Sequence, residues 1–293
     1  MQFKPLSISD IEIVAPFFSL LKSRTCDYTV GGMLMWRDYY RIEFAISNET
    51  FFSRLFDEDR RPHYNIPIGP DVVAGINEVV KFEKKFCPIV RFCTVPEEYI
   101  DCFNSTELVN ETTEQDMYFD YLYFAKDLVE LRGKKFSGQR NQISQFKRNN
   151  DNWSFIDISE VEIKDVIAFF SSSYHIAEDA SDYEVEENAK VLEVLNNLDQ
   201  YNMFGGVLYS GSRIVGFSLG ETQNDTLFTH IEKADRNCKG AYQMLVNQFS
   251  TRFATGKVEF INREEDMGDL GLRISKQSYH PITQLKKYSV EVR

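Results

Sequence analysis

The two halves of this 293-residue chain have the same order of predicted elements, and this repeat constrains the fold more than any other feature. Each half reads as a strand, a capped helix, three antiparallel strands, a second helix and a further strand. The first helix of each half starts at a Ser-x-x-Glu capping pattern, formed by Ser9 with Glu12 and by Ser159 with Glu162. The repeat predicts an α+β protein of two similar lobes, residues 1–133 and 134–293, each a mixed, mostly antiparallel sheet flanked by helices.

The predicted boundaries follow from hydrophobic periodicity and turn residues. In the first half, strands are predicted at residues 2–6, 40–46, 50–55, 64–68, 89–93 and 118–124, with helices at 11–21 and 72–86. In the second half, strands are predicted at residues 155–158, 204–209, 214–219, 227–231, 257–262 and 287–292, with helices at 163–170, 188–198, 240–253 and 270–276.

Charge and hydropathy exclude several classes of protein. The formal net charge is −12, so the chain is a poor generic ligand for nucleic-acid phosphates: DNA is not expected as a partner, and a tRNA footprint is disfavoured. No apolar stretch approaches the roughly 18 residues of a membrane span, and the N-terminus has no apolar run of the signal-peptide type. We therefore expect a cytoplasmic protein without a membrane span.

One segment departs from the acidic balance. Residues 131–150 contain six Lys or Arg and no Asp or Glu. This segment is interpreted as a grip for the phosphates of a carrier such as CoA or tRNA, as a docking surface for the other lobe, or simply as the solvated face of a helix.

The cysteines give no sign of a metal or disulfide framework. The chain has five, an odd number, and no pair has the C-x-x-C spacing of a zinc site. We expect reduced, mostly buried thiols, no bound metal and no permanently bound cofactor.

The tract at residues 258–281 is the most informative. A predicted strand runs into a dense set of carboxylates and cations with two glycines, which is typical of a ligand-facing edge. The alternative is a solvated loop that caps a helix, with Asp269 and Lys276 offsetting its dipole. The candidate substrate-binding residues of this tract are Asn262, Glu264, Asp266, Arg273 and Lys276.

This tract resembles the C-terminal signature of the phosphatidylglycerol lysyltransferase C-terminal-domain family. The similar residues are Asn262, Arg263, Glu264, Glu265, Asp266, Met267, Gly268, Gly271, Leu272, Arg273, Lys276, Ser278 and Tyr279, with a second set at 120–123, 127–128, 131, 133–136 and 140–141, and Tyr288 near the end. The resemblance covers the junction and the second half, and it implies a FemX-like fold of two tandem GNAT-like lobes. Such folds bind an acyl donor where two central strands splay apart.

The resemblance also implies a donor loop. GNAT enzymes hold the donor pyrophosphate on an Arg/Gln-x-x-Gly-x-Gly/Ala loop at a helix N-terminus, where free amides and the helix dipole favour phosphate. At the matching place Arg236, Gly240 and Ala241 fit the pattern, while Lys239 replaces the first glycine. Lys239 either adds a phosphate contact or blocks the loop, and an ordinary helix start is the alternative.

Catalytic candidates come from the predicted central strand and the signature. Direct acyl transfer needs a base for the acceptor, a polarised carbonyl and a proton donor for the leaving group. Strand alternation puts His230 and Glu232 on one face, as candidate bases. Tyr279 is the candidate acid, and for each of the three a satisfied, structural polar residue is the alternative.

These observations predict a transferase that moves an acyl or aminoacyl group from acyl-CoA or aminoacyl-tRNA, as co-substrate, to an amine or hydroxyl acceptor. The expected partners are a small molecule or an aminoacyl carrier. The alternative is a non-catalytic GNAT-like module that binds a ligand or a protein, which the Lys239 departure favours.

Overall fold

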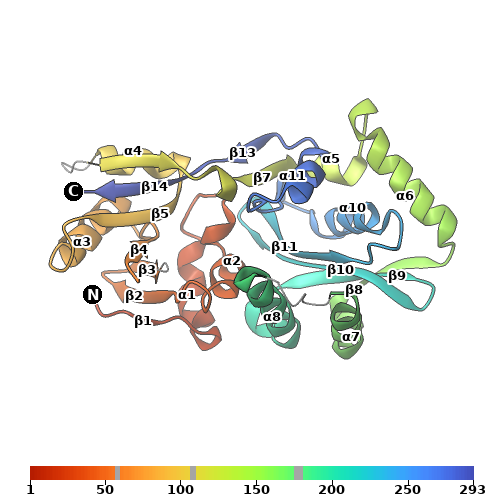
Figure 1. Ribbon diagram of the computed structural model, residues 1–293, viewed down its shortest axis with the longest axis horizontal. Helices are drawn as coiled ribbons and strands as arrows, with labels where there is room; N and C mark the ends of the chain where they lie inside the picture. Colours follow the sequence, from red (N-terminus) through yellow and green to blue (C-terminus); the bar gives the residue numbers. More distant parts are fainter. Residues whose placement is uncertain (57–59, 106–109, 175–180) are drawn as a thin grey trace. The chain divides into compact units, whose positions relative to one another are not determined.

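The protein forms two compact units, each with its own mixed sheet (Figure 1). The computed structural model describes residues 1–56, 60–105, 110–174 and 181–293. Unit 1 comprises residues 1–120, 265–269 and 284–293, and unit 2 comprises residues 121–264 and 270–283. The units are discontinuous in sequence, and the repeat junction expected near residue 133 stays a prediction.

Unit 1 carries the first sheet and four α-helices of the described residues. Its strands are β1 (Lys4–Pro5), β2 (Glu43–Ser47), β3 (Thr50–Phe56), β4 (Pro62–Tyr64), β5 (Val90–Pro96), β6 (Asn110–Glu114) and β14 (Lys287–Val292). Its helices are α1 (Ile11–Phe18), α2 (Val30–Met35), α3 (Val72–Glu83) and α4 (Ile100–Asn104).

Unit 2 carries the second sheet. Its strands are β7 (Asp120–Phe124), β8 (Trp153–Asp157), β9 (Phe204–Ser210), β10 (Arg213–Gln223), β11 (Thr226–Ala234), β12 (Phe260–Asn262) and β13 (Thr283–Leu285), with unit boundaries inside β7 and β13. Its helices are α5 (Ala125–Glu130), α6 (Ser137–Asn149), α7 (Ile163–Ser173), α8 (Asp182–Asn196), α9 (Leu198–Tyr201), α10 (Ala241–Phe253) and α11 (Leu270–Gln277).

The two sheets have the same strand order, with one strand of each half exchanged. The first sheet runs β1-β2-β3-β4-β5-β14-β6, and the second, from its other edge, runs β8-β9-β10-β11-β12-β7-β13. In both, the fourth and fifth strands are parallel while the neighbouring pairs are antiparallel. The seventh strand of each half, β7 or β14, is therefore inserted into the sheet of the other half, and this shared order supports the internal duplication.

The core of unit 2 lies between its sheet and α10. Figure 1 shows α10 on one face of this sheet and α7 and α8 on the other. The spacing of Ala241, Leu245 and Phe249 places these apolar residues on one side of α10, as expected, where they pack against buried residues such as Leu208 and Leu227.

The local capping differs from the sequence expectation. The first capping interaction pairs Ser7 with Asp10, whose carboxylate accepts the Ser7 N–H at 3.0 Å. At the second site Asp157 accepts the Ser159 N–H at 3.1 Å. Both contacts cap a 3-10 turn that precedes the α-helix, so the Ser9 and Ser159 capping boxes were wrong.

In unit 1 a tyrosine fills the place where the parallel strands part. The β4–β5 ladder ends at Tyr64 and Phe92. Beyond it, the buried Tyr28 hydroxyl accepts the Ile66 N–H at 3.2 Å and donates to the Thr94 carbonyl at 3.3 Å. The gap between the two strands is thus closed by a side chain of the same unit.

Replacing Tyr28 by Phe should destabilise unit 1 by about 1–3 kcal/mol, because the Ile66 N–H and the Thr94 carbonyl lose their buried partner. Urea denaturation measures the loss. Tyr99→Phe is the control, since its hydroxyl accepts the Lys22 N–H at an exposed position. Equal losses in the two variants would contradict a special role for Tyr28.

Candidate functional site

The central strand of unit 2 carries a bulge and then leaves its parallel neighbour. Register on β10 passes from Leu219 opposite Ile231 to Gly220 opposite Thr229, so His230 is an extra residue on β11. The β11–β12 ladder ends at Phe228 and Asn262, although β11 continues to Ala234. The second half of β11 therefore borders a gap in the sheet, beside the bulge.

The bulge separates the two candidate bases. The alternation that placed His230 and Glu232 on one face assumed a regular strand, and the extra residue breaks it. His230 enters one polar network and Glu232 another, so their expected common face was wrong.

His230 lies between two carboxylates. Its Nδ1 is 2.7 Å from Glu264 Oε1 and its Nε2 is 2.8 Å from Glu221 Oε1, with the imidazole fully buried. Two ionised carboxylates accept hydrogen bonds only from an imidazole that carries both protons. Burial alone would lower the pKa of His230, but the hydrogen bonds to Glu221 and Glu264 raise it to about 10.

The backbone holds Glu264 in an uncommon conformation. Its φ is +58°, in the left-handed region that non-glycine residues rarely adopt. The buried Asn262 side chain accepts the Glu264 N–H at 2.6 Å, and the Glu264 carbonyl accepts the Tyr121 N–H at 3.1 Å. Asn262 therefore acts on the shape of the loop, and Glu264, about a quarter exposed, faces His230.

Glu232 belongs to the second network. Its Oε2 accepts two hydrogen bonds from Arg263, at 3.0 Å from Nε and 2.7 Å from Nη2. The buried Arg263 guanidinium lies 4.8 Å from the centre of the Tyr279 ring. Because Arg263 follows the end of β12 and Glu232 is on β11, this ion pair crosses the gap.

Tyr279 is buried in the core of unit 2 beneath Arg263. Burial raises the pKa of its hydroxyl well above the usual value, and the neighbouring Arg263 charge opposes this only in part. A phenol of that kind gives up a proton reluctantly. The catalytic assignments of Glu232, His230 and Tyr279 stay predictions, with these contacts limiting what each can do.

The predicted donor loop leads from β11 into α10. Arg236 and Lys239 are exposed, while Gly240 and Ala241 are buried at the start of the helix. Gly240 has a φ of +81°, and a Cβ there would lie 2.3 Å from the Gln142 carbonyl oxygen of α6. This glycine is required by close packing on α6, whether or not the loop binds phosphate.

The remaining signature residues do not gather at one point. Asp266 belongs to unit 1, where its carboxylate accepts the Gly268 N–H at 2.9 Å. In unit 2, Lys276 is buried on α11 with its ammonium 5.9 Å from the Tyr121 ring centre, and Arg273 is half-buried. Substrate binding by these residues stays a prediction.

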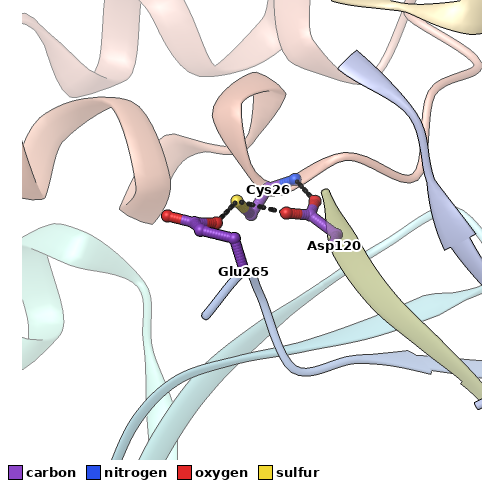
Figure 2. Close-up of side chains that lie close together, drawn as sticks. All are labelled: Cys26, Asp120 and Glu265. Carbon is purple, nitrogen blue, oxygen red and sulfur yellow. Dashed lines mark hydrogen bonds between the residues drawn. The ribbon is translucent and has the colours of Figure 1, made fainter. Parts of the chain in front are cut away.

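Unit 1 contains a buried cluster that the sequence did not reveal. Figure 2 shows Cys26, Asp120 and Glu265 converging, with the Cys26 Sγ 3.4 Å from Asp120 and 3.3 Å from Glu265. The Cys26 N–H donates to Asp120 at 2.7 Å. Burial, followed by the neighbouring carboxylates, raises the pKa of the Cys26 thiol, so this is an inert thiol and not a nucleophile.

The charge at the centre of this cluster is the ammonium of Lys287. It lies 2.7 Å from Asp120, 2.5 Å from Asp27 and 3.7 Å from Glu265, and it is 1% exposed. Donor atoms of Cys26, Asp120 and Glu265 are within 4.8 Å of one another, a spacing that suits a metal ion. Lys287 already supplies the cation, so this group is interpreted as a structural ion cluster.

Sequence reasoning missed Glu221, Asp27 and Lys287 as members of these networks. Glu221 and Asp27 are each a single charged residue in or beside an apolar segment, and that isolation was the available signal. Lys287 directly follows Lys286, so no such signal marked it. His175 and Glu178, a lone histidine and the start of an acidic run, lie outside the described residues.

Replacing Lys287 by Met should cost about 3–5 kcal/mol of stability, because the carboxylates of Asp120 and Asp27 are left without their buried counter-ion. The neighbouring Lys286→Met is the control and should change little, since Lys286 pairs with Glu114 at the surface. Chemical denaturation of the two variants gives the comparison. Similar stabilities would mean that the cluster contributes no net stabilisation.

The charged state of His230 predicts a pH dependence. Its folded pKa, about 10, lies above the unfolded value near 6.5, so its stabilisation is complete below about pH 6.5 and is lost as pH rises towards 10. The difference in unfolding free energy between wild type and His230→Gln should fall steadily from pH 6.5 to 10. Urea titrations at several pH values measure it, and a constant difference would refute a charged imidazole.

Across the described residues, no helix combines the length and apolar character of a bilayer span.

Two solved structures are similar to this protein over nearly all of its length. A conserved protein of unknown function from Bacteroides thetaiotaomicron is 26% identical, with a TM-score of 0.89 over 100% of both chains. L-PGS from Bacillus licheniformis has a TM-score of 0.64 at 14% identity, covering 95% of this chain and 90% of that one. These structures and the paired sheets confirm the expected α+β fold of two lobes, each with a mixed, mostly antiparallel sheet flanked by helices.

The sequence also matches one curated relative and one family model. An uncharacterized protein of Mycoplasmoides gallisepticum is 26% identical over 196 residues, which is 67% of this chain and 61% of that protein. The family model described as phosphatidylglycerol lysyltransferase, C-terminal, matches residues 18–291. The chain therefore belongs to the phosphatidylglycerol lysyltransferase C-terminal family.

Proposed function

We propose that the protein is an aminoacyltransferase of the GNAT type and that unit 2 carries the reaction. The observation that supports this best is the gap beside β11, where a bulge, two charged networks and the start of α10 lie on one short stretch of chain. GNAT folds bind the acyl donor at such a gap, with the donor's phosphates at the N-terminus of the following helix.

The contrast with unit 1 supports unit 2 as the reactive lobe. Both sheets have the same strand order, but in unit 1 the Tyr28 hydroxyl occupies the gap and takes the Ile66 N–H. That backbone donor is no longer free to polarise a carbonyl. In unit 2 the corresponding region carries ionisable groups, of which Glu264 keeps partial exposure.

The transfer needs a carboxylate base more than a histidine. The acceptor nitrogen or oxygen bonds to the donor carbonyl carbon, the bond from that carbon to the carrier oxygen breaks, and the acceptor proton moves to a base. The carrier oxygen is protonated from solvent. His230 already holds both ring protons below about pH 10, so it cannot accept another. Glu264 is therefore the better candidate base, and His230 donates a hydrogen bond to it.

The ion pair across the gap favours an aminoacyl ester over acyl-CoA. A pantetheine arm lying between the parted strands would have to displace the buried Arg263–Glu232 pair, which is costly without a replacement partner. Lys239 in the donor loop also favours an aminoacyl ester over acyl-CoA, because CoA-binding loops carry glycine at this position. The family description names a lysyltransferase, and we carry over to this chain only the aminoacyl class of donor.

The basic segment suits the carrier. Its cations, Arg132, Lys134, Lys135, Arg140, Lys147 and Arg148, are all exposed around α6, while Phe136 and Phe146 are buried. A local cationic face of this kind can contact carrier phosphates on an otherwise acidic protein.

A ligand-binding module without catalysis is the second candidate. The observation in its favour is the same Arg263–Glu232 pair, which fills the gap with the protein's own side chains as Tyr28 does in unit 1. A module of this kind would bind a ligand at the donor loop without turnover.

Donor binding tests the proposal. A non-hydrolysable aminoacyl-adenylate analogue and a short 3′-aminoacylated RNA should raise the thermal midpoint, whereas acetyl-CoA, longer acyl-CoAs and free CoA should not. Lys239→Glu should weaken donor binding about tenfold through charge reversal at a phosphate contact. Arg252→Glu, at the other end of α10 and 58% exposed, is the matched control.

The outcomes separate the alternatives. Stabilisation by CoA compounds that Lys239→Glu abolishes would replace the aminoacyl donor by acyl-CoA. Binding of an aminoacyl donor without transfer to any amine or hydroxyl acceptor would favour the binding module. No binding of any donor would overturn the transferase proposal.

A further inference from the structure

Glu221 is a buried carboxylate that no sequence motif singles out. It lies near the end of β10 and is 8% exposed, and its Oε1 is 2.8 Å from His230 Nε2. The opposite ring nitrogen of His230 faces Glu264, the exposed member of the network. One imidazole thus joins a buried carboxylate to the carboxylate beside the gap.

The two carboxylates, Glu221 and Glu264, together determine how many protons the His230 ring carries. A neutral imidazole has one N–H and can donate to only one of them, so the second would face a lone pair. The hydrogen bonds from both ring nitrogens to carboxylates therefore favour the imidazole that carries two protons. If Glu221 were absent, burial would favour the neutral ring, and Glu264 would lose a charged neighbour.

We propose that Glu221 is a positioning residue for the transfer reaction: through His230 it holds the Glu264 carboxylate in its orientation at the gap. This inference rests on the proposed function. Glu221 itself does not contact the reacting atoms. Its influence passes through two hydrogen bonds, of 2.8 and 2.7 Å, across a fully buried ring.

The environment of the ring supports this chain of contacts. From β10 it meets Glu221, from β11 the Phe228 ring stacks at 6.3 Å between centres, and from the segment after β12 it meets Glu264. Phe228 is apolar and fully buried, so it fixes the ring plane without offering charge. The positive charge on His230 is therefore stabilised by its hydrogen bonds to the two glutamates.

Glu221→Gln is a suitable test because it keeps the shape of the side chain and removes only its negative charge. The Gln amide can donate to Nε2 of a neutral His230, whose Nδ1–H still donates to Glu264. The hydrogen bonds are preserved while the imidazolium is lost. Glu187→Gln, which removes a carboxylate paired with Lys233 on the same unit, is the matched control.

Two readouts test the inference on the full-length protein. The first is the NMR titration of the His230 ring, assigned with His230→Gln. The wild-type ring should titrate near pH 10, and in Glu221→Gln the midpoint should fall by at least about one unit, a tenfold loss of proton affinity. Glu187→Gln should leave the midpoint unchanged.

The second readout is the rate of aminoacyl transfer. In Glu221→Gln, kcat should fall about 10- to 100-fold with little change in the KM of the donor. The hydrogen bond from His230 to Glu264 is then neutral and weaker, so it holds the Glu264 carboxylate less firmly while the donor contacts remain. Glu221→Asp, which restores the charge, should recover part of the loss.

The results would overturn the inference in three ways. A wild-type His230 that titrates near 6.5, or a midpoint unmoved by Glu221→Gln, would show that Glu221 does not hold the ring charged. A lowered midpoint with normal kcat would show that the ring charge does not serve the reaction. A wild-type protein that transfers nothing would overturn the proposed function and the positioning role together, even where the titration shows the charged ring.

Discussion

The burial of the Lys287 ammonium among carboxylates is the interaction on which unit 1 depends. It brings together segments around residues 26, 120, 265 and 287, which are far apart in sequence. Each buried charge would be costly alone, and together they compensate one another. Since Lys287 begins β14, the strand that the second half contributes to the first sheet, the ion cluster secures the strand exchange at its first residue.

The two similar sheets differ at the place where their parallel strands part. Each has a parallel pair that parts after a short ladder, ending at Tyr64 and Phe92 in unit 1 and at Phe228 and Asn262 in unit 2. In unit 1 the gap is closed by Tyr28, a neutral hydroxyl that satisfies the backbone. In unit 2 it is bordered by charged pairs. A closed gap contributes stability, while a charged one is costly to bury and is therefore the better place to look for function.

The two networks of unit 2 differ in how far they are exposed to solvent. The Arg263–Glu232 pair is buried and closed on itself, so it joins the two strands across the gap. The network of Glu221, His230 and Glu264 ends at a partly exposed carboxylate, that of Glu264. The single extra residue at the β11 bulge is what sends His230 and Glu232 into different networks.

The sequence by itself determined the repeat, the α+β class, the family and most elements, because periodicity and turn residues are local signals: α10 and the β9–β10 hairpin lie where they were expected. It also marked Asn262 and Glu264 as polar residues at a strand end and His230 as a polar residue of the central strand. Only the tertiary structure decided that β7 and β14 change places, that Glu221 and Lys287 complete buried networks, and that the alternation fails at His230. Those features depend on strand register and on charges meeting across long sequence separations, which no local pattern encodes.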